Sequence, residues 1–236
     1  MVLTMNRIMP AFALSLLVVA APAGAAERRY PVTDFTKVQV EGPFQVVLKT
    51  GLNSSARAEG SAAGLDRLSV EVVSGTLRVR TNRSAWGGYP GDTVGPVRIE
   101  VTTRDLSAAS VIGSGGLEID KVRGLRIDLS LSGSGRLSVA AAEADNLFLG
   151  LVGAGRMSLA GKAKQLKATI QGSGDLAAEG LRAEDAQLSA DTSGLVTFTA
   201  GRTAKVRASG PGDVAILGTP TCEVEARGAG RVSCGR

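Results

Sequence analysis

The sequence has no histidine, only two cysteines, and aromatic residues at only 3% of its 236 positions. Without an imidazole there is no base for a Ser-His-Asp or Cys-His nucleophile, and no zinc site that needs a histidine ligand. Two thiols are also too few for a four-cysteine metal site. The hydrophobic fraction of 44% is that of an ordinary globular protein, so we expect a packed core that contains few rings.

Clusters of basic residues are also missing. The chain has 27 basic and 22 acidic residues, and this small excess is spread along its length. No group of Lys and Arg side chains alternates with aromatic residues, so we expect no nucleic-acid partner.

One apolar run lies near the N-terminus. Residues 1–25 have the three parts of a secretory signal peptide: Arg7 as the positive region, an apolar stretch over 11–21, and small residues over 23–25. The mature chain is expected to begin near Ala26, with no integral membrane anchor after cleavage. This predicts a periplasmic or secreted protein of the bacterial cell envelope.

Glycine is abundant, with 31 residues, and its placement is regular. A Gly-x-Gly tripeptide, or a close variant of it, recurs every 18 to 20 residues in the second half of the chain. The tripeptides begin at Gly113, Gly133, Gly153, Gly172, Thr192, Gly210 and Gly228. Apolar residues recur two, four and six positions before each tripeptide from Gly133 on, and four and six positions after the first residue of every tripeptide. Spacing by two is the period of a β-strand.

This repeat of strand, glycine turn and strand predicts an all-β fold, a single-domain right-handed parallel β-helix (β-solenoid) with coils of about 18–20 residues. Residues 30–104 are expected to form other β-strands that cap one end, and residues 105–236 the Gly-x-Gly coils. Alternating apolar residues predict strands on both sides of Gly42 and over 97–101, and a hairpin that turns at Ser74 and Gly75.

The mature chain resembles the head GIN domain family of putative auto-transporter adhesins. The resemblance rests on the segments 35–38, 42–46, 65–68 and 75–77, on Gly51, and on the strand-glycine repeats that follow. It implies an exported β-helical domain with an adhesin-like role, and it supplies no catalytic residues.

Cys222 and Cys234 lie six positions before and six positions after the start of the last glycine tripeptide. Both are therefore expected to point inward from facing strands. In an exported protein this placement favours a disulfide that fixes the terminal coil. The alternative is a pair of reduced thiols in the core.

Two other features are candidates for contacts. Trp86 and Tyr89 lie in a loop rich in glycine and proline, where their rings could contact a sugar or a partner surface, or fold back over one end of the solenoid. Stacked coils also bring Arg156 beside Asp175, and Asp213 beside Arg231 in the last pair of coils, as expected ion pairs on the surface.

We therefore expect a non-enzymatic binding or scaffolding protein without metal, cofactor or catalytic residues, whose partners are envelope glycans or envelope proteins. The alternative is a β-helical lyase or glycosidase that acts on a polysaccharide. The acids Glu143 and Asp145, and Glu184 and Asp185, are expected at opposite turns or connections, where they form no catalytic pair. Self-association through the ends of the solenoid is a third hypothesis.

Overall fold

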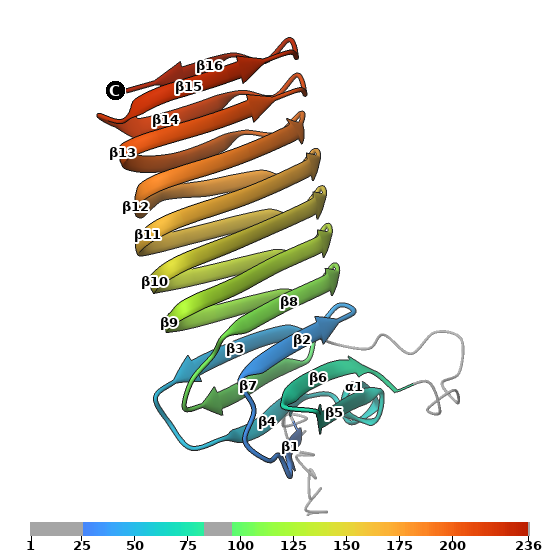
Figure 1. Cartoon of the computed structure of the whole chain (residues 1–236). Helices are drawn as coiled ribbons and strands as arrows, with labels where there is room; N and C mark the ends of the chain where they lie inside the picture. The colour runs from blue at the N-terminus through green and yellow to red at the C-terminus, as the bar shows by residue number, and fades with distance from the viewer. Residues whose placement is uncertain (1–25, 83–95, 236) are drawn as a thin grey trace, which may run out of the picture.

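The computed structural model describes residues 26–82 and 96–235. They form a rod of stacked β-coils, with the N-terminal strands at one end and β16 (Val232–Cys234) at the other (Figure 1). No helix in these two ranges is long and apolar enough to cross a membrane. The expected signal peptide, Trp86 and Tyr89 lie outside the described residues, so these three expectations stay predictions.

The coils follow one another in parallel register, as the repeat predicts. Each of the long strands bends once, so that its first half lies in one sheet and its second half in the facing sheet (Figure 1). The strands of the coils are β9 (Gly116–Gly133), β10 (Arg136–Gly153), β11 (Arg156–Gly172), β12 (Asp175–Thr192), β13 (Val196–Ala208), β14 (Val214–Gly218), β15 (Thr221–Ala226) and β16. In Figure 1 the chain crosses in front toward the glycine turns and returns behind, rising as a right-handed coil.

The predicted apolar columns fill the space between the two sheets. Leu137 pairs with Leu117 below it and with Met157 above it, and all three side chains are buried. The column that contains Ile127 and Leu147 is buried in the same way. Since the coils are narrow, each column accepts aliphatic side chains, and Phe198 is a buried ring in one of them.

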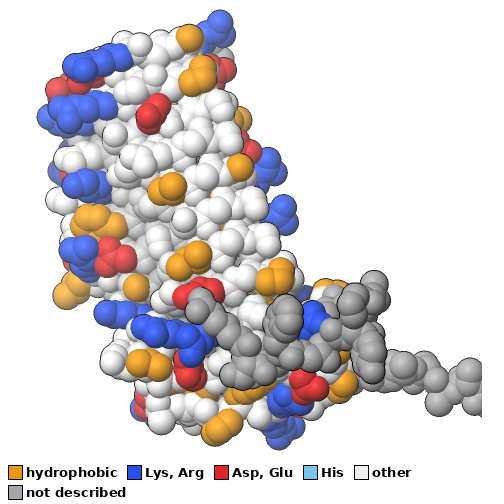
Figure 2. All heavy atoms as spheres, turned by 90° about the vertical axis from the view of Figure 1, so that its right-hand side faces the viewer, with side chains coloured by type: hydrophobic (Ala, Val, Ile, Leu, Met, Phe, Trp, Pro, Cys, Tyr) orange, Lys and Arg blue, Asp and Glu red, His pale blue; other side chains and the backbone are white. Residues whose placement is uncertain are grey.

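The glycine turns stack directly on one another. Gly153 has φ +113°, and a Cβ atom added to it would lie 2.5 Å from the carbonyl oxygen of Gly133 in the coil below. That oxygen accepts a hydrogen bond of 2.9 Å from the N–H of Ala154. The turn thus needs glycine for its backbone conformation and for the approach of the next coil. Figure 2 shows this face of the rod, which carries few large side chains over the stacked turns.

The N-terminal strands extend the solenoid as well as covering its end. β2 (Lys37–Glu41) pairs in parallel with β8 (Ala108–Gly113), and β3 (Gln45–Thr50) with the first half of β9. The turn between β2 and β3 contains Gly42, with φ +101°, which donates its N–H to the carbonyl of Ile112 near the end of β8. This segment is therefore a coil of the same repeat, with Phe44 in place of the second glycine.

The chain leaves the solenoid after β3 and returns at β8. β6 (Thr76–Thr81) and β7 (Arg98–Thr103) add one parallel layer below β2 and β3. β1 (Ala26–Tyr30), β4 (Ser55–Gly60) and β5 (Leu68–Val73) then pair antiparallel, and α1 (Ala62–Asp66) contacts β1 and β4. The predicted hairpin is confirmed, since Ser74 and Gly75 both have positive φ between β5 and β6.

Cys222 and Cys234 form the expected disulfide, with Cα atoms 6.5 Å apart. It joins β15 to β16 across the last coil. The expectation that both thiols point into a closed core is only partly met, because Cys222 is half-buried and Cys234 is exposed. The described residues place no further coil above them.

One of the two predicted ion pairs between neighbouring coils is present among the described residues. The Arg156 guanidinium lies 2.8 Å from the Asp175 carboxylate. In contrast, the Asp213 carboxylate accepts a hydrogen bond of 2.8 Å from the backbone N–H of Arg231, and its side chain is not paired with the guanidinium among the described residues. Asp213 therefore ties one coil to the next through the main chain.

Replacing one glycine of the turn tests the stacking. Gly153→Ala should lower the free energy of unfolding by at least about 2 kcal/mol, because the new methyl group meets a backbone oxygen and the residue keeps a positive φ. Gly150→Ala is the matched control, since its Cβ would lie 3.8 Å from the nearest atom, Ser130 Cβ. Urea unfolding of both variants measures the difference. Equal midpoints would show that the turns tolerate side chains.

The disulfide makes a second prediction. Reduction of the purified mature protein should add two hydrogens, about 2 Da, in an intact-mass measurement. The double variant Cys222→Ser, Cys234→Ser should lose about 2–3 kcal/mol of stability, because the closed loop is short. An unchanged mass on reduction would contradict the disulfide.

The charge pair between β12 and β13 makes the folding free energy depend on pH. Arg202 and Thr203 donate hydrogen bonds to the Asp185 carboxylate and lower its pKa from 3.8 to about 2. Because the Asp185 carboxyl has a lower pKa in the folded state than in the unfolded chain, its ionised form stabilises the fold at pH values above the unfolded pKa. This stabilisation is lost as the pH falls from about 4 toward 2 and the carboxylate becomes protonated. Wild type should therefore lose more stability than Asp185→Asn between neutral pH and pH about 2, measured by urea unfolding. Parallel pH profiles would contradict this assignment.

Candidate functional site

A long groove follows the corner where β9–β12 bend, on the side away from the glycine turns. It has a volume of about 920 Å³ and continues over successive coils from β9 to the end of β14. We call it the edge groove. Its floor consists of small residues stacked in register: Gly124, Ala144, Ala163, Ala183, Ala200 and Gly218.

The local sequence explains the shape of the edge groove. At each bend a small residue points into the core, as Ala144 and Ala183 do, so that the main chain itself forms the floor. The residues on either side of it alternate outward, because successive side chains of a strand point to opposite faces. Charged side chains therefore form one wall on each side of the floor.

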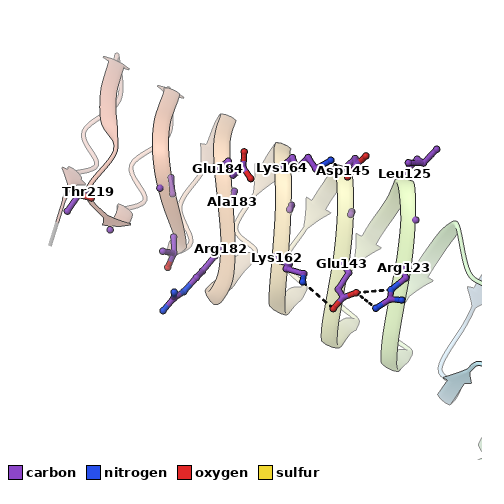
Figure 3. A pocket seen from close by; sticks show the side chains of 17 residues that line it. Arg123, Leu125, Glu143, Asp145, Lys162, Lys164, Arg182, Ala183, Glu184 and Thr219 are labelled. Atoms are coloured by element: carbon purple, nitrogen blue, oxygen red, sulfur yellow. Dashed lines mark hydrogen bonds and ion pairs between the residues drawn. The ribbon is translucent and has the colours of Figure 1, made fainter.

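The first wall carries a chain of ion pairs (Figure 3). The Glu143 carboxylate accepts a hydrogen bond of 2.7 Å from Arg123 Nε, and lies 3.6 Å from Lys162 Nζ. The hydrogen bond from Arg123 is the main reason why the pKa of Glu143 is lowered, and the positive charges of Arg123 and Lys162 act in the same direction. Glu143 is therefore ionised at neutral pH.

The second wall has a single close ion pair. Lys164 Nζ lies 2.8 Å from Asp145, and this hydrogen bond raises the pKa of the lysine. Leu125 stands at one end of this wall with 77% of its surface exposed, and Glu184 stands in the coil beyond Lys164. The wall thus offers an apolar side chain and charges of both signs along its length.

Arg182 differs from the other cations of the edge groove. Among residues 26–82 and 96–235 no carboxylate lies within ion-pair distance of its guanidinium. Its neighbour in the next coil is Thr199, which is uncharged. Figure 3 shows the side chain extended away from Lys162. Arg182 therefore keeps its five N–H donors available to a molecule in the groove.

The structure corrects the expected positions of the acids. Glu143, Asp145 and Glu184 all line the same edge groove, whereas the sequence was interpreted as placing them at opposite turns or connections. The coil that carries Lys162 and Lys164 separates the first two from the third, and each of the first two is paired with a cation. The acids therefore form no facing pair. No cluster of three metal-ligating side chains occurs in the described part of the chain.

Sequence reasoning did not identify the edge groove, although the sequence contains a signal for it. The triplets at 123–125, 143–145, 162–164 and 182–184 each have a small residue at the centre, and seven of their eight flanking residues are charged. These triplets recur with the same period as the glycine turns, and each lies about midway along the chain between two successive turns. The disulfide lies outside this lining, in the last coil.

Solved structures of similar fold come from species of Bacteroides and Parabacteroides. A "putative adhesin" from Bacteroides fragilis superposes with a TM-score of 0.81 at 20% identity, over 91% of this chain and 98% of that one. A "putative lipid binding protein" from Parabacteroides distasonis gives a TM-score of 0.71 at 19% identity, over 89% and 96% of the two chains. A "putative adhesin" from Parabacteroides merdae gives 0.68 at 15% identity, over 89% and 95%. At these identities the likeness shows the fold.

The comparison with curated proteins found no match. The model of one protein family matches residues 34–220, which include the strands from β2 to β14 and the edge groove. The expected resemblance is therefore confirmed over most of the chain. This protein belongs to the family described as "Putative auto-transporter adhesin, head GIN domain".

Proposed function

We propose that this protein is an exported, adhesin-like binding module of the bacterial envelope that holds an extended glycan in the edge groove. The observation that carries the proposal is the groove itself, which repeats a floor of small residues from coil to coil, between walls that are mostly charged. Successive coils are about 4.8 Å apart, the spacing of paired strands. A polymer with a short repeat can therefore meet an equivalent part of the floor, and further wall residues, in each successive coil.

A glycan fits the chemistry of the edge groove better than a peptide does. Peptides that extend a sheet need a strand with unpaired N–H and C=O groups. The strands below the groove, β10–β12, are each paired with a neighbour on both sides, so they have no free edge there. The walls instead offer side-chain donors and acceptors, and the floor offers a flat surface, which suits hydroxyl groups and the faces of sugar rings.

The electrostatics favour binding over hydrolysis. A glycosidase needs one carboxyl group that is protonated at working pH, which requires a raised pKa. Arg123 and Lys162 do the opposite to Glu143 and keep it ionised. An enzyme that processes polysaccharides remains the second hypothesis, and turnover of a bound glycan would support it.

The family and the first 25 residues support a location outside the cytoplasm. The family is described as adhesin-like, and residues 1–25 have the pattern of a signal peptide. We infer a periplasmic or secreted protein. Mature protein in the periplasmic fraction or the medium, starting near Ala26, would support this inference, whereas an unprocessed cytoplasmic chain would contradict it.

Binding to a glycan array, followed by variants of the edge groove, tests the proposal. The mature protein should bind one class of envelope polysaccharide, and Arg182→Glu should weaken that binding about tenfold or more, because a charge-assisted hydrogen bond is lost. Arg136→Glu is the matched control, since it makes the same charge change at an exposed arginine on the face of the glycine turns.

Three outcomes would contradict the proposal. Equal losses in the two variants would show that the overall charge, and not the edge groove, controls binding. Release of reducing ends or unsaturated sugars from the bound polysaccharide would show an enzyme. Binding to an envelope protein but to no glycan would show that the partner is a protein, which contradicts the proposed glycan ligand.

A further inference from the structure

The two ends of the solenoid are finished differently. At the N-terminal end the strands turn antiparallel, and the outermost strand there, β1, has four exposed residues out of five and no apolar column. At the C-terminal end the last coil is parallel like those below it. Within the described residues β15 pairs only with β13, and β16 only with β14. Each therefore presents one edge of unpaired backbone groups.

The apolar columns are also open at the C-terminal end. Val224 is 43% exposed, whereas Val206, the residue below it in the same column, is 2% exposed. Across the coil, Val232 is half-buried above the fully buried Val214. This end thus combines free strand edges with uncovered core side chains. Another pair of strands could cover both.

The charges of β15 do not oppose such pairing. Lys205 Nζ lies 2.8 Å from Glu223, and Arg207 Nε lies 3.0 Å from Glu225, so the coil below neutralises both acids. Arg227 also lies beside Glu225, so each of the two acids has a basic partner within its own copy. An antiparallel pair centred on Val224 brings Glu223 opposite Glu225 of the second copy, and the basic partners of these acids offset the repulsion between the two carboxylates.

From these observations we infer that two copies of this chain associate end to end through β15 and β16. A twofold axis perpendicular to the two sheets places β15 antiparallel to β15 of the second copy and, at the same time, β16 antiparallel to its counterpart. Such an isologous contact uses the same surface on both copies and closes at two. The dimer is a rod of double length with an N-terminal cap at each end, and each copy keeps its edge groove.

The disulfide supports this geometry. It links Cys222 of β15 to Cys234 of β16, so it holds the two edges at a fixed separation before a second copy arrives. An edge that is already ordered loses less conformational entropy on association. Reduction of the disulfide is therefore expected to weaken the dimer.

Sedimentation velocity and light scattering on the mature protein test the inference. Between low micromolar and near-millimolar concentration the mass of the wild type should rise to about twice the protomer mass and then stay constant. Val224→Lys should remain monomeric over the same range, because it places a charge at the centre of the contact. Val152→Lys is the matched control: Val152 is 50% exposed on a strand in the middle of the rod, and this variant should dimerise like wild type.

Folding can be checked separately, because the Val224 side chain is already exposed and its replacement should leave the circular dichroism spectrum unchanged. A wild type that stays monomeric at all concentrations would overturn the inference. A Val224→Lys variant that still dimerises would also overturn it, because the contact would then lie elsewhere. A mass that keeps growing beyond two copies would show fibre formation and contradict the closed twofold contact.

Discussion

The structure depends on the direct stacking of backbone on backbone at the glycine turns. Each turn hydrogen-bonds to the turn below, as Ala154 does to Gly133, and a Cβ atom at Gly153 would occupy the space of that same Gly133 carbonyl. Because every coil must meet the next in this way, the turns fix the register of both sheets. The register then aligns the apolar columns inside the rod and the charged residues outside it.

Much of the fold could be predicted because the repeat is a local signal. The offsets of apolar residues from each glycine tripeptide gave the correct register for all the later coils, and the symmetric placement of Cys222 and Cys234 about the last tripeptide predicted the disulfide, although the two side chains are less buried than expected. The same offsets also hold around Gly42, at Val40 and Val46, but this coil lacks the second glycine and is 71 residues from Gly113. Because this long segment separates Gly42 from the regular tripeptides, the coil around Gly42 was hard to recognise from the sequence as part of the repeat.

The edge groove was harder to predict because it depends on how neighbouring coils share charges. A sequence shows that Glu143 and Asp145 are acids, but not that both lie at one corner and take different cations as partners. The pattern of a small residue between charged residues becomes informative only when the register is known. The sequence contains no histidine, and the walls of the groove instead carry carboxylates paired with arginine and lysine.

These features combine in one functional account. The stacking of coils produces a rigid rod, the bend of each coil adds one small floor residue and two wall residues, and so the edge groove lengthens with every coil. The most direct test is the affinity of the mature protein, by calorimetry, for a series of oligosaccharides of increasing length from the envelope polysaccharide that we propose as its ligand. Affinity should rise with each added sugar until the groove is filled and then stay constant. An affinity independent of chain length would show a single-sugar site and contradict the account.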